Sequence, residues 1–321
     1  MLVEMKPTSL IIVMLLLLSG CATAPMTSIT VNDTYTNFDD ETLLGRYAPI
    51  IAPQQTILEY NRIGHAAARL DDGEEKIYIN TDEPVFYTQE QDFITARGHR
   101  YHNLIYRFHF TEVPQPFLTT GKNGGLFVVI TLNEQQQPVL ISTVHSCGCY
   151  LAMVPTSYLD KSAYPARWDL KRQSIYGESL PGQLDYPAAF VPRMRPLITL
   201  RSGTHRVMDV ALVHSNQYEE GSQVAQLLPM TELDHLPLGS GQTSFFNESG
   251  LLKGYVKGAI KPWELLLMSW WTFDFNIGRD KRLGDPAETG VVFYTSLKPW
   301  ARSDSNMWFF ADFLDYWGWR L

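Results

Sequence analysis

Leu126-Phe-Val-Val-Ile-Thr-Leu132 and Val139-Leu-Ile-Ser-Thr-Val144 are two apolar stretches rich in β-branched residues, separated only by Asn133-Glu-Gln-Gln-Gln-Pro138. Valine, isoleucine and threonine favour strands, whereas polar residues followed by proline favour a turn. A parallel crossover needs about a dozen residues or more between its strands, so this short connection excludes it. We therefore predict an antiparallel pair covering residues 125–132 and 138–145.

A third stretch, His102-Asn-Leu-Ile-Tyr-Arg-Phe-His-Phe110, alternates with period two. Successive side chains of a strand point to opposite faces. One face carries His102, Leu104, Tyr106, Phe108 and Phe110, and the other carries Asn103, Ile105, Arg107 and His109. This pattern predicts a half-buried strand. The strand is expected to cover 99–111, and the same signals predict further strands at 76–80, 84–88, 196–201 and 205–213.

Helical signals are fewer than strand signals. They lie at 39–47, 54–70, 262–273 and 305–318, the last with Ser305 as N-cap and Gly318 as the stop. Between the second helix and the first strands, Asp71-Asp-Gly-Glu-Glu75 predicts a turn. The expected fold class is α+β, with a β-rich, mainly antiparallel core, peripheral helices and an aromatic-rich C-terminal helical segment.

Tryptophan is concentrated near the C-terminus, where seven of the eight residues of this type lie. They are Trp263, Trp270, Trp271, Trp300, Trp308, Trp317 and Trp319. An aromatic stripe at helical spacing favours burial in the core. The alternative is a surface that faces lipid headgroups, where tryptophan is enriched.

The N-terminus carries a lysine, Lys6, followed by the apolar run Leu10-Ile-Ile-Val-Met-Leu-Leu-Leu-Leu18, which is too short to span a bilayer. Leu18-Ser19-Gly20-Cys21 follows directly. This segment resembles the signal peptide and lipobox of bacterial lipoproteins. The resemblance implies cleavage before Cys21 and a permanent membrane anchor through acyl chains on that cysteine. Because Ala22 follows the cysteine, the resemblance also implies sorting to the outer membrane, with the protein facing the periplasm or the cell surface.

The expected organisation is a signal peptide at 1–20, a lipidated flexible tether at 21–37 and a single globular domain at 38–321. Charged residues make up 19% of the chain and hydrophobic ones 45%, a balance typical of globular proteins rather than disordered ones. The net charge of -8, without a basic tract, argues against a nucleic-acid partner. The expected partners are the membrane, reached through the lipid, and another envelope protein.

The segment His145-Ser-Cys147-Gly-Cys149 holds every cysteine except Cys21. Its His and Cys residues have the same parity, so an extended chain places them on one face, and Gly148 permits a bend. Four interpretations stay open: a Cys147–Cys149 disulfide, a metal site, a reactive thiolate with a lowered pKa, and two buried inert thiols. The metal site would hold zinc or copper. Its ligands would be His145, Cys147 and Cys149, completed by a distant residue such as His102 or His109.

Other polar residues give weaker signals. His205 and Asp209 share one face of a predicted strand but lie about 13 Å apart along it. The charged loop 278–285 is expected to be solvated, with Arg279, Asp280 and Asp285 as candidate pocket residues. Linear signatures of zinc proteases, serine hydrolases and phosphate-binding loops are absent from the sequence.

Two functional hypotheses follow. The first is a non-catalytic envelope lipoprotein that binds a ligand, a metal or a partner protein. The second is a periplasmic metal- or thiol-dependent enzyme in which His145, Cys147 and Cys149 form the catalytic centre. An enzyme should place these residues in a concave pocket with converging polar groups. A binding module should leave them buried or bridged and expose an apolar patch elsewhere.

Overall fold

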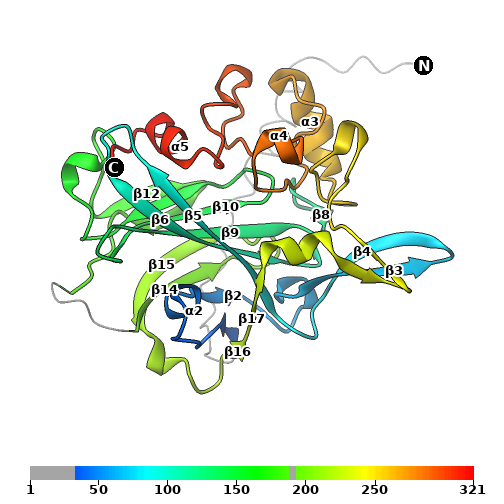
Figure 1. Cartoon of the computed structure of the whole chain (residues 1–321), viewed down its shortest axis with the longest axis horizontal. Helices are drawn as coiled ribbons and strands as arrows, with labels where there is room; N and C mark the ends of the chain where they lie inside the picture. Colours follow the sequence, from blue (N-terminus) through cyan, green and yellow to red (C-terminus); the bar gives the residue numbers. More distant parts are fainter. Residues whose placement is uncertain (1–32, 188–192) are drawn as a thin grey trace, which may run out of the picture.

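The computed structural model describes residues 33–187 and 193–321 (Figure 1). The predicted signal peptide, Cys21 and most of the predicted tether lie outside the described residues. Strand β1, Tyr35–Thr36, is already paired with β2 and β16, and Tyr35 is buried in the core. The boundary predicted at Asn37 is therefore a few residues too late.

The centre of the molecule is a six-stranded sheet with the order β11-β10-β9-β6-β5-β17. Its strands are β5 Val85–Ile94, β6 Arg100–His109, β9 Gly125–Leu132, β10 Pro138–His145, β11 Ala152–Pro155 and β17 Gln226–Pro229. All neighbours are antiparallel except β17, which runs parallel to β5. The antiparallel pair predicted at 125–132 and 138–145 is confirmed with its bounds.

A five-stranded sheet with the order β15-β14-β2-β1-β16 packs against one face of the central sheet (Figure 1). It contains β1, β2 Ile50–Pro53, β14 Met194–Leu200, β15 Val207–His214 and β16 Gln223–Val224. The main hydrophobic core lies between the two sheets, where Tyr106 and Val128 of the central sheet share a cluster with Ile198 of β14. The face of β6 that carries Leu104, Tyr106 and Phe108 is thus buried between the two sheets.

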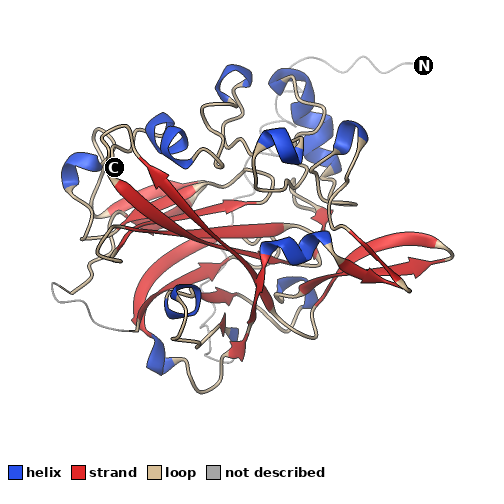
Figure 2. Cartoon of the chain, in the orientation of Figure 1, coloured by secondary structure: helices blue, strands red, loops and turns tan. Residues whose placement is uncertain are grey.

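The second face of the central sheet is covered by the C-terminal segment, as the helices above the sheets in Figure 2 show. Ile105 and Phe127 share a hydrophobic cluster there with Phe310 and Phe313 of helix α5, Phe310–Tyr316. The prediction that β6 is half-buried is therefore wrong. Arg107 and its neighbours on that face are buried because a third layer, remote in sequence, packs on them.

The helices are short, and most of them lie on the side of this third layer (Figure 2). The α-helices described are α2 Leu43–Arg46, α3 Pro262–Thr272, α4 Pro286–Thr289 and α5. The 3-10 turns are η2 Glu59–Asn61, η3 Lys161–Ala163, η4 Ser215–Gln217, η5 Met230–Asp234, η6 Gly250–Leu252 and η7 Pro299–Ala301. Among the described residues, no helix is both long enough and apolar enough to cross a bilayer.

Two helix predictions need correction. The helix expected at 54–70 is instead η2 followed by strand β3, His65–Asp71, which forms a hairpin with β4, Glu74–Asn80. Pairing of β3 with β4 outweighs the loosely helical spacing of the apolar residues in this segment. Helix α5 begins at Phe310 rather than near Ser305, whose hydroxyl accepts the N–H of Ser296 at 3.1 Å instead of capping a helix.

Short two-stranded sheets complete the fold. They pair β7 Glu112–Val113 with β8 Gly121–Lys122, β12 Arg172–Ile175 with β13 Glu178–Pro181, and β18 Leu236–Leu238 with β19 Gly241–Thr243. The fold is thus α+β and β-rich, with mainly antiparallel pairing, as the sequence predicts. Loops join the strands of the central sheet at both of its ends. One of these ends carries the cysteine segment.

Candidate functional site

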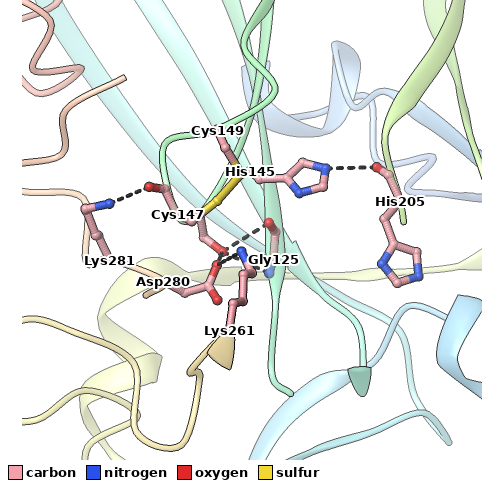
Figure 3. The surroundings of a disulfide bond; sticks show 9 residues. Gly125, His145, Cys147, Cys149, His205, Lys261, Asp280 and Lys281 are labelled. Carbon is pink, nitrogen blue, oxygen red and sulfur yellow. Dashed lines mark hydrogen bonds and ion pairs between the residues drawn. A yellow bond between two sulfur atoms is a disulfide. The ribbon is translucent and has the colours of Figure 1, made fainter. Parts of the chain in front are cut away.

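The cysteine segment is a tight turn at the end of β10. The carbonyl of His145 accepts the N–H of Gly148 at 2.7 Å, and the N–H of His145 donates to the carbonyl of Cys149 at 2.9 Å. Gly148 has φ +88°, and a Cβ atom there would lie 2.0 Å from the carbonyl oxygen of Tyr294. Only glycine meets both conditions without strain. In this turn Cys147 and Cys149 are joined by a disulfide (Figure 3).

Ser146 joins this turn to a distant part of the chain. Its Oγ accepts the N–H of Gly125 at 2.9 Å and donates to Oδ1 of Asp280 at 2.5 Å, and its carbonyl accepts the N–H of Lys281 at 2.8 Å. The segment around residue 280 is therefore held directly beneath the disulfide (Figure 3). The expectation that this charged loop is solvated is wrong for Asp280 and Lys281, which are both buried.

Four buried ionisable side chains gather around this contact: Lys261, Glu264, Asp280 and Lys281. The Nζ atom of Lys261 lies 3.8 Å from Oδ1 of Asp280. The Nζ atom of Lys281 donates to the carbonyl of Cys147 and lies 4.1 Å from the centre of the Tyr294 ring. Burial lowers the pKa of Lys281 to about 8 and raises the pKa of Glu264 above its usual value. Both groups are thus closer to neutral than in water.

A cavity of about 180 Å³ opens beside the disulfide. Its lining is mainly apolar and comes from Leu118, Cys147, Gly148, Cys149, Tyr150, Tyr176, Glu264, Met268, Ile277, Gly278, Tyr294, Thr295 and Leu297. Glu264 of α3 is the one carboxyl group in this lining. The arrangement offers aromatic and sulfur surfaces for an apolar body and one hydrogen-bonding carboxyl group for its polar end.

His145 points away from this cavity, toward His205 (Figure 3). Its Nε2 lies 3.1 Å from the carbonyl oxygen of His205, and Nε2 of His205 lies 2.8 Å from the carbonyl oxygen of Tyr60. Carbonyls only accept, so each Nε2 carries a proton. Burial lowers the pKa of His145 well below its usual range and that of His205 to about 3, so both rings are neutral.

The five residues predicted as metal ligands do not come together. His102 and His109 lie seven residues apart on β6, a separation of about 23 Å in a strand. His102 binds Asp92 and Glu90 at 2.8 and 2.7 Å, whereas His109 accepts from Nε of Arg107 at 2.8 Å. Within residues 33–187 and 193–321, no group of three or more His, Cys, Asp or Glu residues could hold a metal ion. The predicted zinc or copper site is therefore not assembled.

The remaining candidates are also dispersed. Asp209 is exposed on β15, whereas His205 is buried in the turn before that strand and stacks on Phe110 at 3.8 Å. Asp285 caps α4 by accepting the N–H of Ala287 at 2.8 Å. Of the loop residues that the sequence singled out, only Asp280 reaches the cysteine turn. Lys261, Glu264 and Lys281 gave no signal, because folding brings them to Cys147 from more than 100 residues away.

The two bridged cysteines line the cavity, whereas His145 is not part of its lining. The sulfurs form a disulfide rather than a thiolate, and His145 is neutral and turned away. The disulfide itself lines the cavity, so a bound molecule would contact it directly. No protein-family model matches this chain, and neither a curated protein nor a solved structure matches it significantly.

Proposed function

We propose that the chain is a lipoprotein of the bacterial outer membrane, anchored through acyl chains on Cys21 and facing the periplasm, whose folded part is a non-catalytic ligand-binding module. The anchor is supported by the apolar run at 10–18 and by Leu18-Ser19-Gly20-Cys21. Binding rather than catalysis is supported by the bridged cysteines and by the direction of His145. Bridged cysteines are expected of a binding module, whereas a thiol- or metal-dependent enzyme needs them free to react or to bind the metal.

The ligand of this module is a small aromatic molecule with one N–H or O–H donor. The observation that carries this assignment is the cavity lined by the disulfide and tyrosine rings, with Glu264 as its single carboxyl group. A cavity of about 150 Å³ holds a benzene molecule, so about 180 Å³ suits one or two fused rings. A donor on the ligand would pair with Glu264, whose burial makes an unmet hydrogen bond costly.

The ligand assignment is tested with indole and 1-methylindole, which differ by one N–H donor. The full-length protein in lipid nanodiscs should bind indole about tenfold more tightly than 1-methylindole, the difference that one hydrogen bond to a charged or buried group makes. The variant Glu264→Leu should lose this preference. Leu297→Trp should fill the cavity mouth and abolish binding, whereas Leu70→Trp, on the β3 hairpin, should not. Equal affinities in the wild type would refute the role of Glu264.

The anchor is tested independently. Cys21→Ser should abolish incorporation of labelled palmitate and should release the protein from the outer-membrane fraction, without changing indole binding. Unchanged labelling would refute lipidation at Cys21 and leave the cavity assignment intact.

A further inference from the structure

Helix α3 turns its apolar side outward. Only Glu264 and Thr272 of its eleven residues are buried. Its large exposed side chains are Trp263, Leu266, Leu267, Trp270 and Trp271, and two more follow the helix at Phe273 and Phe275. We call these seven residues the α3 face. Its most exposed members include Trp270 at 71% and Phe275 at 80%.

Polar contacts hold the helix in this orientation. Glu264 is directed into the cavity, and the carbonyl of Thr272 accepts Nη2 of Arg302 at 2.6 Å. Just beyond the helix, Asp274 accepts the hydroxyl of Tyr294 and pairs with Arg302 at 3.8 Å. Rotating α3 to bury its tryptophans would expose or break these buried contacts. The α3 face therefore stays outward in a single copy of the chain.

The apolar residues of α3 are spaced like those through which one helix contacts another. Trp263, Leu266, Leu267, Trp270 and Trp271 occupy positions i, i+3, i+4, i+7 and i+8. Side chains at this spacing form the stripe that one helix presents to another. With aromatic side chains of roughly 150 to 250 Å² each, the seven residues expose on the order of 800 Å². That is about the area which each partner contributes to a stable interface, and more than a typical patch on a monomer.

The geometry points to a second copy of this chain as the occupant of the α3 face. A twofold dimer uses the same surface on both subunits, so one apolar stripe supplies both sides of the contact. We propose that two copies pair through α3 and the segment Phe273–Phe275 that follows it. The pairing lies beside the cavity, because Glu264 and Met268 of the same helix line it.

A bilayer fits the face less well. Residues 262–273 contain no lysine or arginine, whereas helices that lie in a membrane interface are rich in both. The described chain also begins near β1, between β2 and β16, on the side opposite α3 (Figure 1). From Cys21 to Asp33 the chain spans at most about 40 Å, whereas a domain of this size is about 50 Å across. The comparison of chain length with domain width rests on the proposed anchor. The lack of lysine and arginine in 262–273 is independent of it.

The test is the state of association of the full-length protein. Analytical ultracentrifugation in a mild detergent should give a dimer for the wild type and a monomer for Leu266→Glu. The control is Leu70→Glu, the same change at a leucine of similar exposure on the β3 hairpin, 58% against 65%, and it should stay dimeric. Circular dichroism and unchanged indole binding verify that each variant is folded.

Crosslinking in intact cells supplies the second measurement. Cys147 and Cys149 are bridged, so Leu266→Cys and Trp270→Cys each add a single free thiol to the mature chain. Crosslinking with a bis-maleimide should give a species of twice the monomer mass. A monomeric wild type without such a species would overturn the proposal. So would a crosslink from either cysteine variant to a different envelope protein. Absence of palmitate labelling in the wild type would refute the anchor and not the dimer.

Discussion

Lys281 is a buried amine whose ammonium group faces a carbonyl and an aromatic ring. It contacts the carbonyl of Cys147 and the ring of Tyr294, and its charge is influenced by Asp274, Asp280, Lys261 and Glu264. Burial lowers its pKa from 10.5 to about 8. Between these two values the unfolded chain holds a proton that the folded protein has released. The free energy of unfolding should therefore rise with pH across this window.

This prediction is tested with Lys281→Met, which keeps the length of the side chain and removes the titration. Wild-type stability should rise by about 1 kcal/mol per pH unit from pH 8 to 9.5 relative to the variant. Urea unfolding at pH 7, 8, 9 and 9.5 measures the difference, and tyrosine ionisation is common to both proteins. Parallel profiles for the two proteins would show that Lys281 keeps its ordinary pKa.

At the scale of secondary structure, helix α5 seals the outer face of the central sheet. Phe313 is fully buried there beside Phe310, with ring centres 5.2 Å apart, whereas Phe309, one residue before the helix, is about half exposed. Phe313→Ala should destabilise the protein by about 3 to 5 kcal/mol, because it leaves a cavity in that layer. Phe309→Ala should cost less than about 1 kcal/mol. Chemical unfolding of both variants measures this contrast, and equal losses would contradict the layer's role.

The elements also show what sequence patterns can and cannot predict. Strands β9 and β10 follow from their β-branched runs, because a fully buried strand needs apolar residues on both faces. The hairpin of β3 and β4 was only half predicted. Its turn at Asp72-Gly73 and strand β4 are visible in the sequence, but the small residues Ala66 and Ala67 read as helical until a paired strand fixes them.

In the candidate site, too, the sequence predicts what depends on neighbouring residues but not what distant residues bring together. The cysteine turn is formed by neighbouring residues, so the sequence can predict it. The two cysteines are expected on one face of the chain, and Gly148 permits the bend. Lys281 lies in the charged loop 278–285, for which the sequence predicts solvent exposure, but Ser146 bonds to Asp280 and Lys281 across the fold and both are buried. Lys261 and Glu264 precede this loop, and no local pattern relates them to the cysteine turn.

Taken as a whole, the molecule separates its proposed functions in space. The described chain begins at the five-stranded sheet, whereas the cavity and the α3 face lie in the opposite layer (Figure 1). The central sheet connects the two sides, since β9 and β10 contribute to both hydrophobic clusters. A copy anchored at one side can therefore present its cavity and its α3 face away from the point of attachment.

The whole fold should also be independent of the disulfide, although the cavity should not be. Cys147 and Cys149 are two residues apart, so their bond joins no separate elements. Closing so small a loop removes little chain entropy, and we expect Cys147→Ala/Cys149→Ala to lower the free energy of unfolding by only about 1 to 2 kcal/mol. Both sulfurs line the cavity, however, so indole affinity should fall several-fold in this variant and after reduction by dithiothreitol. Thermal unfolding and indole titration on the same samples separate the two effects. Global unfolding on reduction would mean that the turn, rather than the sheets, holds the third layer in place.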